Sequence, residues 1–451
     1  MGLERDPMTD ASPPPLAGPL FRRRLDGSLP LAVRGEGCWI EDAAGRRYLD
    51  AVGGAYTVNL GHGVEEIARA IGEQARTLAY VNGVQFTNAA AEHLAAELAE
   101  VLPPPLRHSY FLTSGSDAIE AAVKLARQVW VERGRPGKWK VISRRPSYHG
   151  NTLAALALSG RESYRRPYLP LLLDLPSVPA PDPYRDPASP ACTGEALADE
   201  LERQDPETVA AFLFEPVLGS AGGAVVPDAV HYERIVALCR EHDVLLIADE
   251  VLTGMGRTGR WLAIDHYDGL PDILVLGKGI SGGYAPLSAM VATDDILDTL
   301  RQGSGNFVHA QTFSHTPVVC AAGLAALRVL KRDRLVERCA ALAPRLRAAL
   351  QPLAALPLVG DVRSIGLFAA VELVADRESR EPLPRARRVA ERVAARARDH
   401  GLLVWSNGGH VDGERGDLVL VAPPFTIAED ELDEVGARLG RALAEVATEE
   451  A

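Results

Sequence analysis

The stretch LLIADEVLTGMGRTG, residues 245–259, decides between two possible folds for this chain. A run of leucine, isoleucine and alanine ends at Asp249, and Gly254, Gly256 and Gly259 follow. The glycines match the G-x-G-x-x-G pattern of a dinucleotide-binding turn. The aspartate, in contrast, would be a ligand-binding carboxylate, because ligands of open α/β sheets bind beyond the carboxyl ends of the strands.

Three features of this region disfavour a dinucleotide-binding turn. The glycines begin five residues after Asp249 instead of opening a helix directly, and no second strand with a terminal acid follows. The segment WLAIDHYDGLPD, residues 261–272, also intervenes. The stretch therefore favours a site built around Asp249.

Short apolar runs alternate with helical patterns on both sides of this stretch. A helix is predicted over residues 116–134, and strands are predicted over 108–113, 140–143, 209–217, 244–251 and 272–277. Continuous apolar strands between helices indicate an α/β fold whose mostly parallel sheet is covered on both faces.

The two ends of the chain predict a smaller α+β domain. Residues 37–51 read as a hairpin with its turn at 42–45, and the chain after residue 318 is mostly helical, with a strand candidate at 366–374 and a final helix from about Glu429. We expect a flexible N-terminal arm (1–30), the first part of the small domain (31–62), a large cofactor-binding α/β domain (63–325) and the rest of the small domain (326–451).

The composition excludes several classes of function. With 451 residues, 47% of them hydrophobic, the chain is expected to be globular, and its net charge of −12 argues against a nucleic-acid or anionic-membrane partner. No apolar run reaches the roughly 20 residues of a membrane span, and the N-terminus has no apolar core of a secretory signal. The five cysteines are scattered without a C-x-x-C pair, which predicts reduced thiols in a cytoplasmic protein and no zinc site.

Two of the predicted strands lead into a phosphate site and an aromatic ring. Ser114, Gly115 and Ser116 follow the strand at 108–113 and open a long helix, where free N–H groups and hydroxyls favour phosphate. Tyr148 and His149 follow the strand at 140–143.

Two other strands end in a carboxylate and a lysine, Asp249 and Lys278, and the lysine is flanked by glycines. Together with the phosphate site and the ring, they predict a pyridoxal 5'-phosphate site. Lysine forms a Schiff base with the aldehyde of this cofactor, a carboxylate keeps its ring nitrogen protonated, and an aromatic side chain stacks on its ring. Val251 points the same way as Asp249 along the strand and would pack on the other face of the ring.

Each of these residues also has an ordinary structural interpretation. Asp249 could form an ion pair with Arg257, Ser116 could cap its helix, Tyr148 could belong to the core, and Lys278 could be a solvated surface residue. Glu215, a candidate cofactor contact, and Glu250 are expected to orient their neighbours rather than react. His149 is also a candidate cofactor contact, with an ordinary polar role as the alternative. The histidines show no spacing typical of a metal site.

The chain resembles the class III, fold-type I aminotransferases over nearly its whole length. Eight motifs carry the resemblance in the order of the family: NLGHG (59–63), TSGSDAIEAAVKLAR (113–127), SYHGNT (147–152), EPVLGSAGG (215–223), ADEVLTGMGRTG (248–259), LGKGISGGYAPLSA (276–289), HAQTFSHTP (309–317) and APPFTI (422–427). The resemblance implies a seven-stranded type of sheet, pyridoxal phosphate on Lys278, Asp249 as partner of the ring nitrogen, and a homodimer with both active sites at the interface. It also implies that Thr312 reaches the phosphate across that interface.

The chain departs from the family pattern at three positions. Many relatives that use 2-oxoglutarate bind its carboxylate with an arginine where this chain has Leu420, and the glutamate that pairs with that arginine falls at Ser220. A glutamine that touches the phenolic oxygen of the cofactor is replaced by Leu252. Since both members of the charged pair are missing together, no buried charge is left unpaired.

The remaining pattern resembles the amine–pyruvate (ω-) transaminases. In that comparison Arg415, in the loop GGHVDGERGD (408–417), would swing in to bind carboxylates, and Tyr56 would line the pocket for the side chain of the amine. Arg415 could also be a solvated loop residue.

The resemblance implies an aminotransferase that moves an amino group from an amine or ω-amino acid to a keto acid, pyruvate in preference to 2-oxoglutarate, in two half-reactions. Racemases or epimerases, aminomutases, decarboxylases and phospholyases share every motif above and stay as alternatives. A non-catalytic protein on this fold would be expected to lose Lys278 or Asp249, and both are present.

Overall fold

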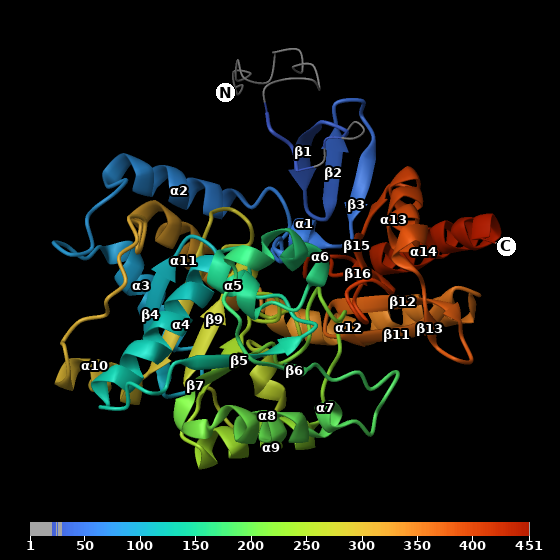
Figure 1. Ribbon diagram of the computed structural model, residues 1–451. Coiled ribbons are helices and arrows are strands. Elements are labelled where there is room, and N and C mark those ends of the chain that lie inside the picture. Colours follow the sequence, from blue (N-terminus) through green and yellow to red (C-terminus); the bar gives the residue numbers. More distant parts are fainter. Residues whose placement is uncertain (1–19, 24, 26–28, 451) are drawn as a thin grey trace.

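The computed structural model describes residues 20–23, 25 and 29–450 (Figure 1). Most of the predicted N-terminal arm, residues 1–30, therefore lies outside the described residues. The described part consists of one seven-stranded sheet with its helices and two smaller sheets near the two ends of the chain.

The seven-stranded sheet is the predicted α/β sheet. Its order is β4-β10-β9-β8-β7-β5-β6, and only β10 runs antiparallel to its neighbours. The strands are β4 (Leu106–Leu112), β5 (Lys140–Arg145), β6 (Ser177–Pro179), β7 (Val209–Phe214), β8 (Leu245–Asp249), β9 (Ile273–Leu276) and β10 (Ser288–Thr293). All five predicted strands are present, whereas β6 and β10 were not predicted.

Helices cover both faces of this sheet, which explains the uninterrupted apolar runs. Leu245 and Ile247 of β8 pack against α4 (Gly115–Glu132), while Leu246 and Ala248 pack into the opposite cluster, which contains residues of α9 (Ala229–Glu241) and α11 (Pro317–Arg332). Because side chains alternate along a strand, a sheet buried on both faces needs an apolar residue at every position.

Two smaller sheets stand beside the central one (Figure 1). The predicted hairpin is confirmed, since β2 and β3 pair antiparallel and the Gly45 N–H donates to the Asp42 carbonyl over 2.9 Å. The four-stranded sheet contains β1 (Ala32–Glu36), β2 (Trp39–Asp42), β3 (Arg47–Asp50) and β14 (Leu402–Leu403), and the five-stranded sheet contains β11 (Val359–Ile365), β12 (Phe368–Asp376), β13 (Glu381–Pro382), β15 (Trp405–Gly408) and β16 (Asp417–Val421). Because β14 pairs with β3, residues from both ends of the chain share one sheet, while the domain boundaries themselves stay a prediction.

The remaining helices complete the layers. The final helix begins where it was predicted, at Glu429. These helices are α1 (Gly53–Tyr56), α2 (Glu65–Thr77), α3 (Ala89–Ala99), α5 (Leu153–Leu158), α6 (Glu162–Arg165), α7 (Pro190–Thr193), α8 (Glu195–Gln204), α10 (Asp294–Gln302), α12 (Leu335–Leu350), α13 (Val389–Asp399) and α14 (Glu429–Glu450). Among the described residues, no helix combines the length and the apolar character needed to cross a membrane.

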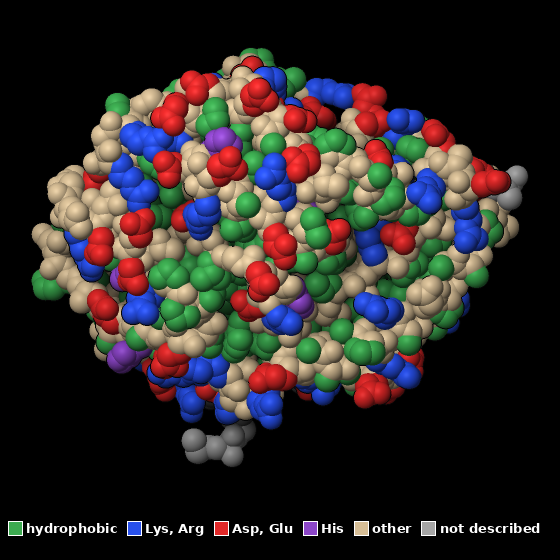
Figure 2. All heavy atoms as spheres, turned by 90° about the horizontal axis from the view of Figure 1, so that it is seen from below, with side chains coloured by type: hydrophobic (Ala, Val, Ile, Leu, Met, Phe, Trp, Pro, Cys, Tyr) green, Lys and Arg blue, Asp and Glu red, His purple; other side chains and the backbone are tan. Residues whose placement is uncertain are grey.

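One face of the molecule shows how the charged side chains are distributed. On the face shown in Figure 2, acidic and basic side chains are interspersed between apolar ones. This face therefore carries no extended basic area of the kind that attracts nucleic acid.

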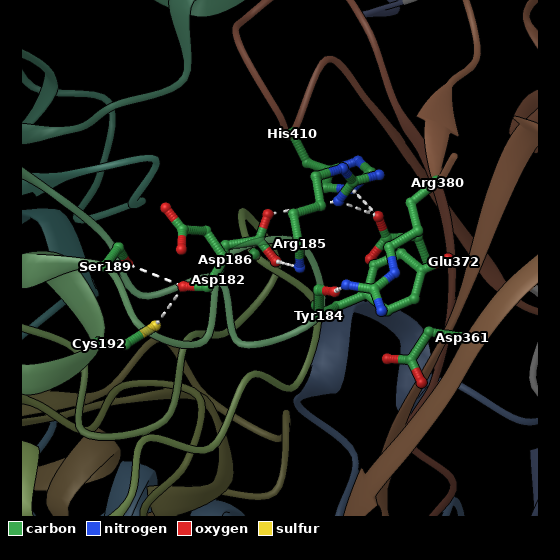
Figure 3. Close-up of polar contacts among 12 residues, drawn as sticks. Asp182, Tyr184, Arg185, Asp186, Ser189, Cys192, Asp361, Glu372, Arg380 and His410 are labelled. Carbon is green, nitrogen blue, oxygen red and sulfur yellow. Dashed lines mark hydrogen bonds and ion pairs between the residues drawn. The ribbon is translucent and has the colours of Figure 1, made fainter. Parts of the chain in front are cut away.

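A buried cluster of charges joins the five-stranded sheet to the segment after β6 (Figure 3). Glu372 of β12 accepts from Arg363 over 2.6 Å and from His410 over 2.9 Å, and it also pairs with Arg185. Burial alone would raise the pKa of Glu372, but His410, Arg363 and Arg185 together hold the pKa well below its usual range. Arg363 also donates to the carbonyls of residues 222 and 223, so the cluster holds the 219–223 loop, which carries Ser220.

Candidate active site

The carboxyl ends of β4, β5, β8 and β9 meet at one edge of the central sheet, and most predicted site residues collect there. They line a cavity of about 310 Å³, here called the cofactor cavity. Its lining includes Ser114, Gly115, Ser116, Tyr148, His149, Glu215, Asp249, Val251 and Lys278, together with Ser220 and Leu252. Tyr56, Thr312 and Arg415 are the predicted site residues that do not line it.

The start of α4 forms a small polar pocket at one end of this cavity. The helix cap is Ser114 and not Ser116, because the Ser114 Oγ accepts from the Asp117 N–H over 3.2 Å. Ser116 lies within the first turn, and its Oγ accepts from the Asn151 N–H over 3.0 Å. A Cβ on Gly150 would lie 2.4 Å from this Oγ, so only glycine fits beside Ser116. Helix N-termini with free N–H groups bind phosphate, and this pocket suits one.

Asp249 pairs with His149 at the end of β8. One carboxylate oxygen lies 2.7 Å from His149 Nδ1, and the other accepts from the Val251 N–H over 3.0 Å. Because an ionised carboxylate only accepts hydrogen bonds, His149 donates from Nδ1. The pairing of Asp249 with Arg257 is wrong: Arg257 donates to the carbonyls of residues 367 and 423 and stacks on Phe425.

Lys278 follows β9 and points into the same cavity. Burial lowers its pKa, although the negative charges of Asp249 and Glu215 oppose this shift. A lower pKa increases the fraction of neutral amine, which is the nucleophilic form. The backbone of Lys278 has φ 44°, in the left-handed region that non-glycine residues rarely adopt and that clusters at functional sites.

Glu215 connects the segments that surround the cavity. Its two carboxylate oxygens accept from the Tyr148 N–H over 3.1 Å and from the Gly219 N–H over 2.8 Å. Burial raises the pKa of Glu215. The glutamate thus positions Tyr148 and the 219–223 loop, in keeping with the orienting role predicted for it.

A second cavity of about 790 Å³, here called the substrate cavity, shares Tyr148, Ser220 and Lys278 with the first. Tyr56 and Trp405 line it, and their rings lie 5.9 Å apart. The Tyr56 hydroxyl is buried and has no hydrogen-bond partner among the described residues. Lys278 Nζ lies 5.9 Å from the centre of the Tyr56 ring, and Lys278 lines both cavities.

Arg161 and Tyr164 also line the substrate cavity, and neither was predicted from the sequence. Both lie at α6, directly after the SYHGNT motif and helix α5. Nothing local in the sequence marks them, because neither strand ends nor glycine patterns point to that short helix.

The structure does not bring Arg415 and Thr312 into either cavity. Arg415 is exposed and pairs with Asp412 over 2.6 Å and with Glu381 over 3.1 Å. Thr312 lies in an exposed loop next to Phe313. Leu420, in contrast, is fully buried beside Leu252 and Tyr56, so the position of the missing arginine is apolar.

These residues fit pyridoxal phosphate. A Cβ at position 150 would crowd the pocket beside Ser116, Ser114 and Ser116 bring hydroxyls to it, and Asp249 and Lys278 line the same cavity. No group of three histidine, cysteine, aspartate or glutamate side chains in the described part of the chain could hold a metal ion. The fold and the site together define a pyridoxal-phosphate-dependent enzyme of fold type I.

Comparison with known proteins identifies the family. The pattern "Aminotransferase class-III" matches residues 23–443, and the chain therefore belongs to the class III aminotransferases, whose cofactor is pyridoxal phosphate. It is 39% identical to the uncharacterized aminotransferase YodT of Bacillus subtilis over 92% of this chain and 95% of that protein. It is 34% identical to the putrescine–pyruvate aminotransferase of Pseudomonas aeruginosa over 90% of this chain and 88% of that one.

Solved structures agree. A PLP-bound amine transaminase from an uncultivated Pseudomonas species has 33% sequence identity and a TM-score of 0.88, covering 96% of this chain and 99% of that chain. The predicted family, fold class, cofactor and type of reaction are thereby confirmed. The alternative reactions on the same cofactor are not favoured, because these relatives are aminotransferases.

Proposed function

We propose that this aminotransferase moves an amino group from an amine or ω-amino acid to pyruvate, with Lys278 and Asp249 as catalytic residues. One observation carries the assignment of the site: Lys278, Asp249 and the Ser114–Ser116 turn line one cavity, although they come from three different strand ends. The neighbouring substrate cavity shares Lys278 and has aromatic walls suited to the side chain of an amine.

The residues that line the cofactor cavity would each have a distinct role. When bound, pyridoxal phosphate supplies an electron sink that stabilises negative charge on the substrate carbon. Ser114, Gly115 and Ser116 would hold its phosphate, and Tyr148 and Val251 would lie against the two faces of its ring. Asp249, oriented by His149, would hold the proton on the ring nitrogen. Lys278 Nζ would bind the cofactor covalently and, once a substrate amine displaces it, would hold and move the substrate proton.

The apolar surroundings of Leu420 support pyruvate as the acceptor. At the position where many relatives bind the distal carboxylate of 2-oxoglutarate with an arginine, this chain has Leu420, which lies fully buried among apolar side chains. Ser220 carries no charge that could pair with an arginine. The putrescine–pyruvate relative uses the small keto acid, as its name states.

The test is a panel of amines and ω-amino acids, each offered with pyruvate and with 2-oxoglutarate to the holoenzyme. We expect amino transfer with pyruvate and at least ~10-fold lower kcat/KM with 2-oxoglutarate, equivalent to about 1.4 kcal/mol. Borohydride reduction followed by peptide mapping should find the cofactor on Lys278, and Lys278→Ala should be inactive. A label on another lysine, or equal use of both keto acids, contradicts the respective part of the proposal.

We further propose a homodimer in which Thr312 contacts the phosphate of the partner's site. Exposed apolar side chains support an interface: Tyr80, Val84 and Phe86 are exposed, and so is Phe313, whose ring lies 6.2 Å from that of Tyr80. Such a patch beside Thr312 suits a self-complementary contact. Light scattering should show a dimer, and Phe313→Asp should weaken both dimer and cofactor binding. A monomer with full cofactor affinity excludes this arrangement.

We propose a cytoplasmic location because the cysteines of the chain are free thiols. All five cysteines are free, and four of them are buried. Burial raises the pKa of Cys38 and Cys320 to about 12, which keeps these thiols protonated and unreactive. Fractionation of cells that produce the protein would locate it, and recovery outside the cytoplasmic fraction would count against the assignment.

A further inference from the structure

The substrate cavity is lined by cations without a matching anion. Arg23, Arg161 and Lys278 line it, and no aspartate or glutamate does. Because Lys278 would bind the cofactor, the guanidinium groups of Arg23 and Arg161 are the cations left to face a substrate. Such a lining favours a ligand that carries a negative charge.

Arg161 is held in place by neutral groups. It donates to Asn407 Oδ1 of β15, and its guanidinium carbon lies 4.2 Å from the centre of the Tyr164 ring. The Asn407 amide is oriented by its other end, since Nδ2 donates to the Ser220 carbonyl over 2.8 Å and to the Ala221 carbonyl over 3.3 Å. The arginine is therefore fixed to the 219–223 loop through one side chain.

No carboxylate neutralises Arg161 within the described part of the chain. The acidic residue next to it, Glu162, instead lies 3.3 Å from Arg165 Nε and 3.7 Å from Arg145. A guanidinium has five N–H donors, and the contact with Asn407 leaves a pair of them free for a carboxylate.

We propose that Arg161 binds the carboxylate of the keto acid acceptor and of amino acid donors, in place of a mobile Arg415. This inference rests on the proposed function. A bidentate pair of Arg161 with a carboxylate would orient the keto acid with its carbonyl carbon toward the Lys278 side of the cavity. Arg161 and Lys278 line the same cavity, so the carboxylate and the carbonyl of the keto acid would face the chain within one space.

The ring of Tyr164 explains how a fixed arginine tolerates an amine without a carboxylate in the other half-reaction. A cation over an aromatic face is attracted by the negative face of the ring, so the guanidinium keeps a partner when no carboxylate is bound. Arg161 is also half-buried rather than buried, which leaves part of it hydrated. Arg415, by comparison, would have to leave Asp412 and Glu381 before it reached the cavity.

The experiment compares Arg161→Met and Arg161→Lys with the matched control Arg415→Met, each as holoenzyme. Stopped-flow absorbance measures the two half-reactions separately, with pyruvate and with 1-phenylethylamine, which has no carboxylate. For Arg161→Met we expect the apparent Kd of pyruvate to rise by about tenfold or more, as for the loss of a charge-assisted hydrogen bond, with an amine half-reaction within about threefold of wild type. Arg161→Lys should show a smaller loss, and Arg415→Met none.

A binding measurement separates this inference from the proposed function. Propanoate, a carboxylate that cannot react, should perturb the cofactor absorbance of the wild type, and its Kd should rise in Arg161→Met but not in Arg415→Met. Unchanged affinity for pyruvate and propanoate in both Arg161 variants, or the loss in Arg415→Met alone, would overturn the inference. Failure of the wild type to aminate pyruvate, with propanoate binding still dependent on Arg161, would overturn the proposed acceptor and leave the carboxylate site standing.

Discussion

Replacing Asp249 with asparagine removes one buried negative charge and keeps the shape of the side chain. The carboxylate is 5% exposed and lies 2.7 Å from His149 Nδ1. The asparagine oxygen can still accept from the Val251 N–H, so the packing at the end of β8 should survive. The substitution therefore tests the charge and not the fold.

The expected loss follows from the burial of that charge. Two opposite charges about 4 Å apart attract each other by roughly 4 kcal/mol at the effective dielectric constant of about 20 that suits such sites. The amide dipole of asparagine replaces only part of this attraction, so the ring nitrogen of the cofactor loses most of its preference for a proton. We expect the amine half-reaction to slow by at least about two orders of magnitude, equivalent to roughly 2.7 kcal/mol of barrier.

The assay is a single-turnover measurement with saturating 1-phenylethylamine, on protein whose cofactor content has been measured. Glu250→Gln is the matched control, because Glu250 is the next residue and is fully buried, but its contacts are Thr253 and the Ile264 N–H. An Asp249→Asn enzyme that binds the cofactor and reacts within about tenfold of wild type would refute the reasoning. An equal loss in Glu250→Gln would refute it too, because the effect would then belong to any buried carboxylate of this region.

Two further predictions use the local geometry. Gly150→Ala would place a Cβ 2.4 Å from Ser116 Oγ, so Ser116 must move, and the Kd of pyridoxal phosphate should rise by roughly 10- to 100-fold in equilibrium dialysis. Gly134→Ala is the control, because Gly134 also has a positive φ but has open space around it. Equal affinities of the two variants for the cofactor would contradict the prediction. Burial raises the pKa of Glu250 from 4.5 to about 7, so between these pH values the folded state binds more protons than the unfolded state and stability falls as pH rises, by on the order of 3 kcal/mol in total. Urea unfolding at pH 5 and pH 8 should therefore show Glu250→Gln gaining stability relative to wild type at the higher pH, and a constant difference between the two proteins would show that Glu250 does not titrate there.

The sequence by itself determined the five strands β4, β5, β7, β8 and β9 of the central sheet and the strand ends at which the proposed cofactor residues lie. Asp249, Lys278 and the Ser114–Ser116 turn each follow an apolar strand, and the carboxyl ends of parallel strands meet at one edge whatever the loops do. This rule needs no knowledge of distant contacts. Strand β15 of the five-stranded sheet was not predicted. It reads Trp-Ser-Asn-Gly, and serine, asparagine and glycine have little intrinsic preference for strands, so no local pattern marks it.

Only the tertiary structure decided which charges meet. Arg161 and Asn407 are 246 residues apart, and their contact depends on how α6 and β15 pack around the 219–223 loop. The same is true of His149 and Asp249, 100 residues apart, and of Arg415, which pairs with Glu381 on the surface. Local periodicity records which face of an element is apolar, but the neighbours of a polar side chain are set by packing between elements, which no short stretch of sequence encodes.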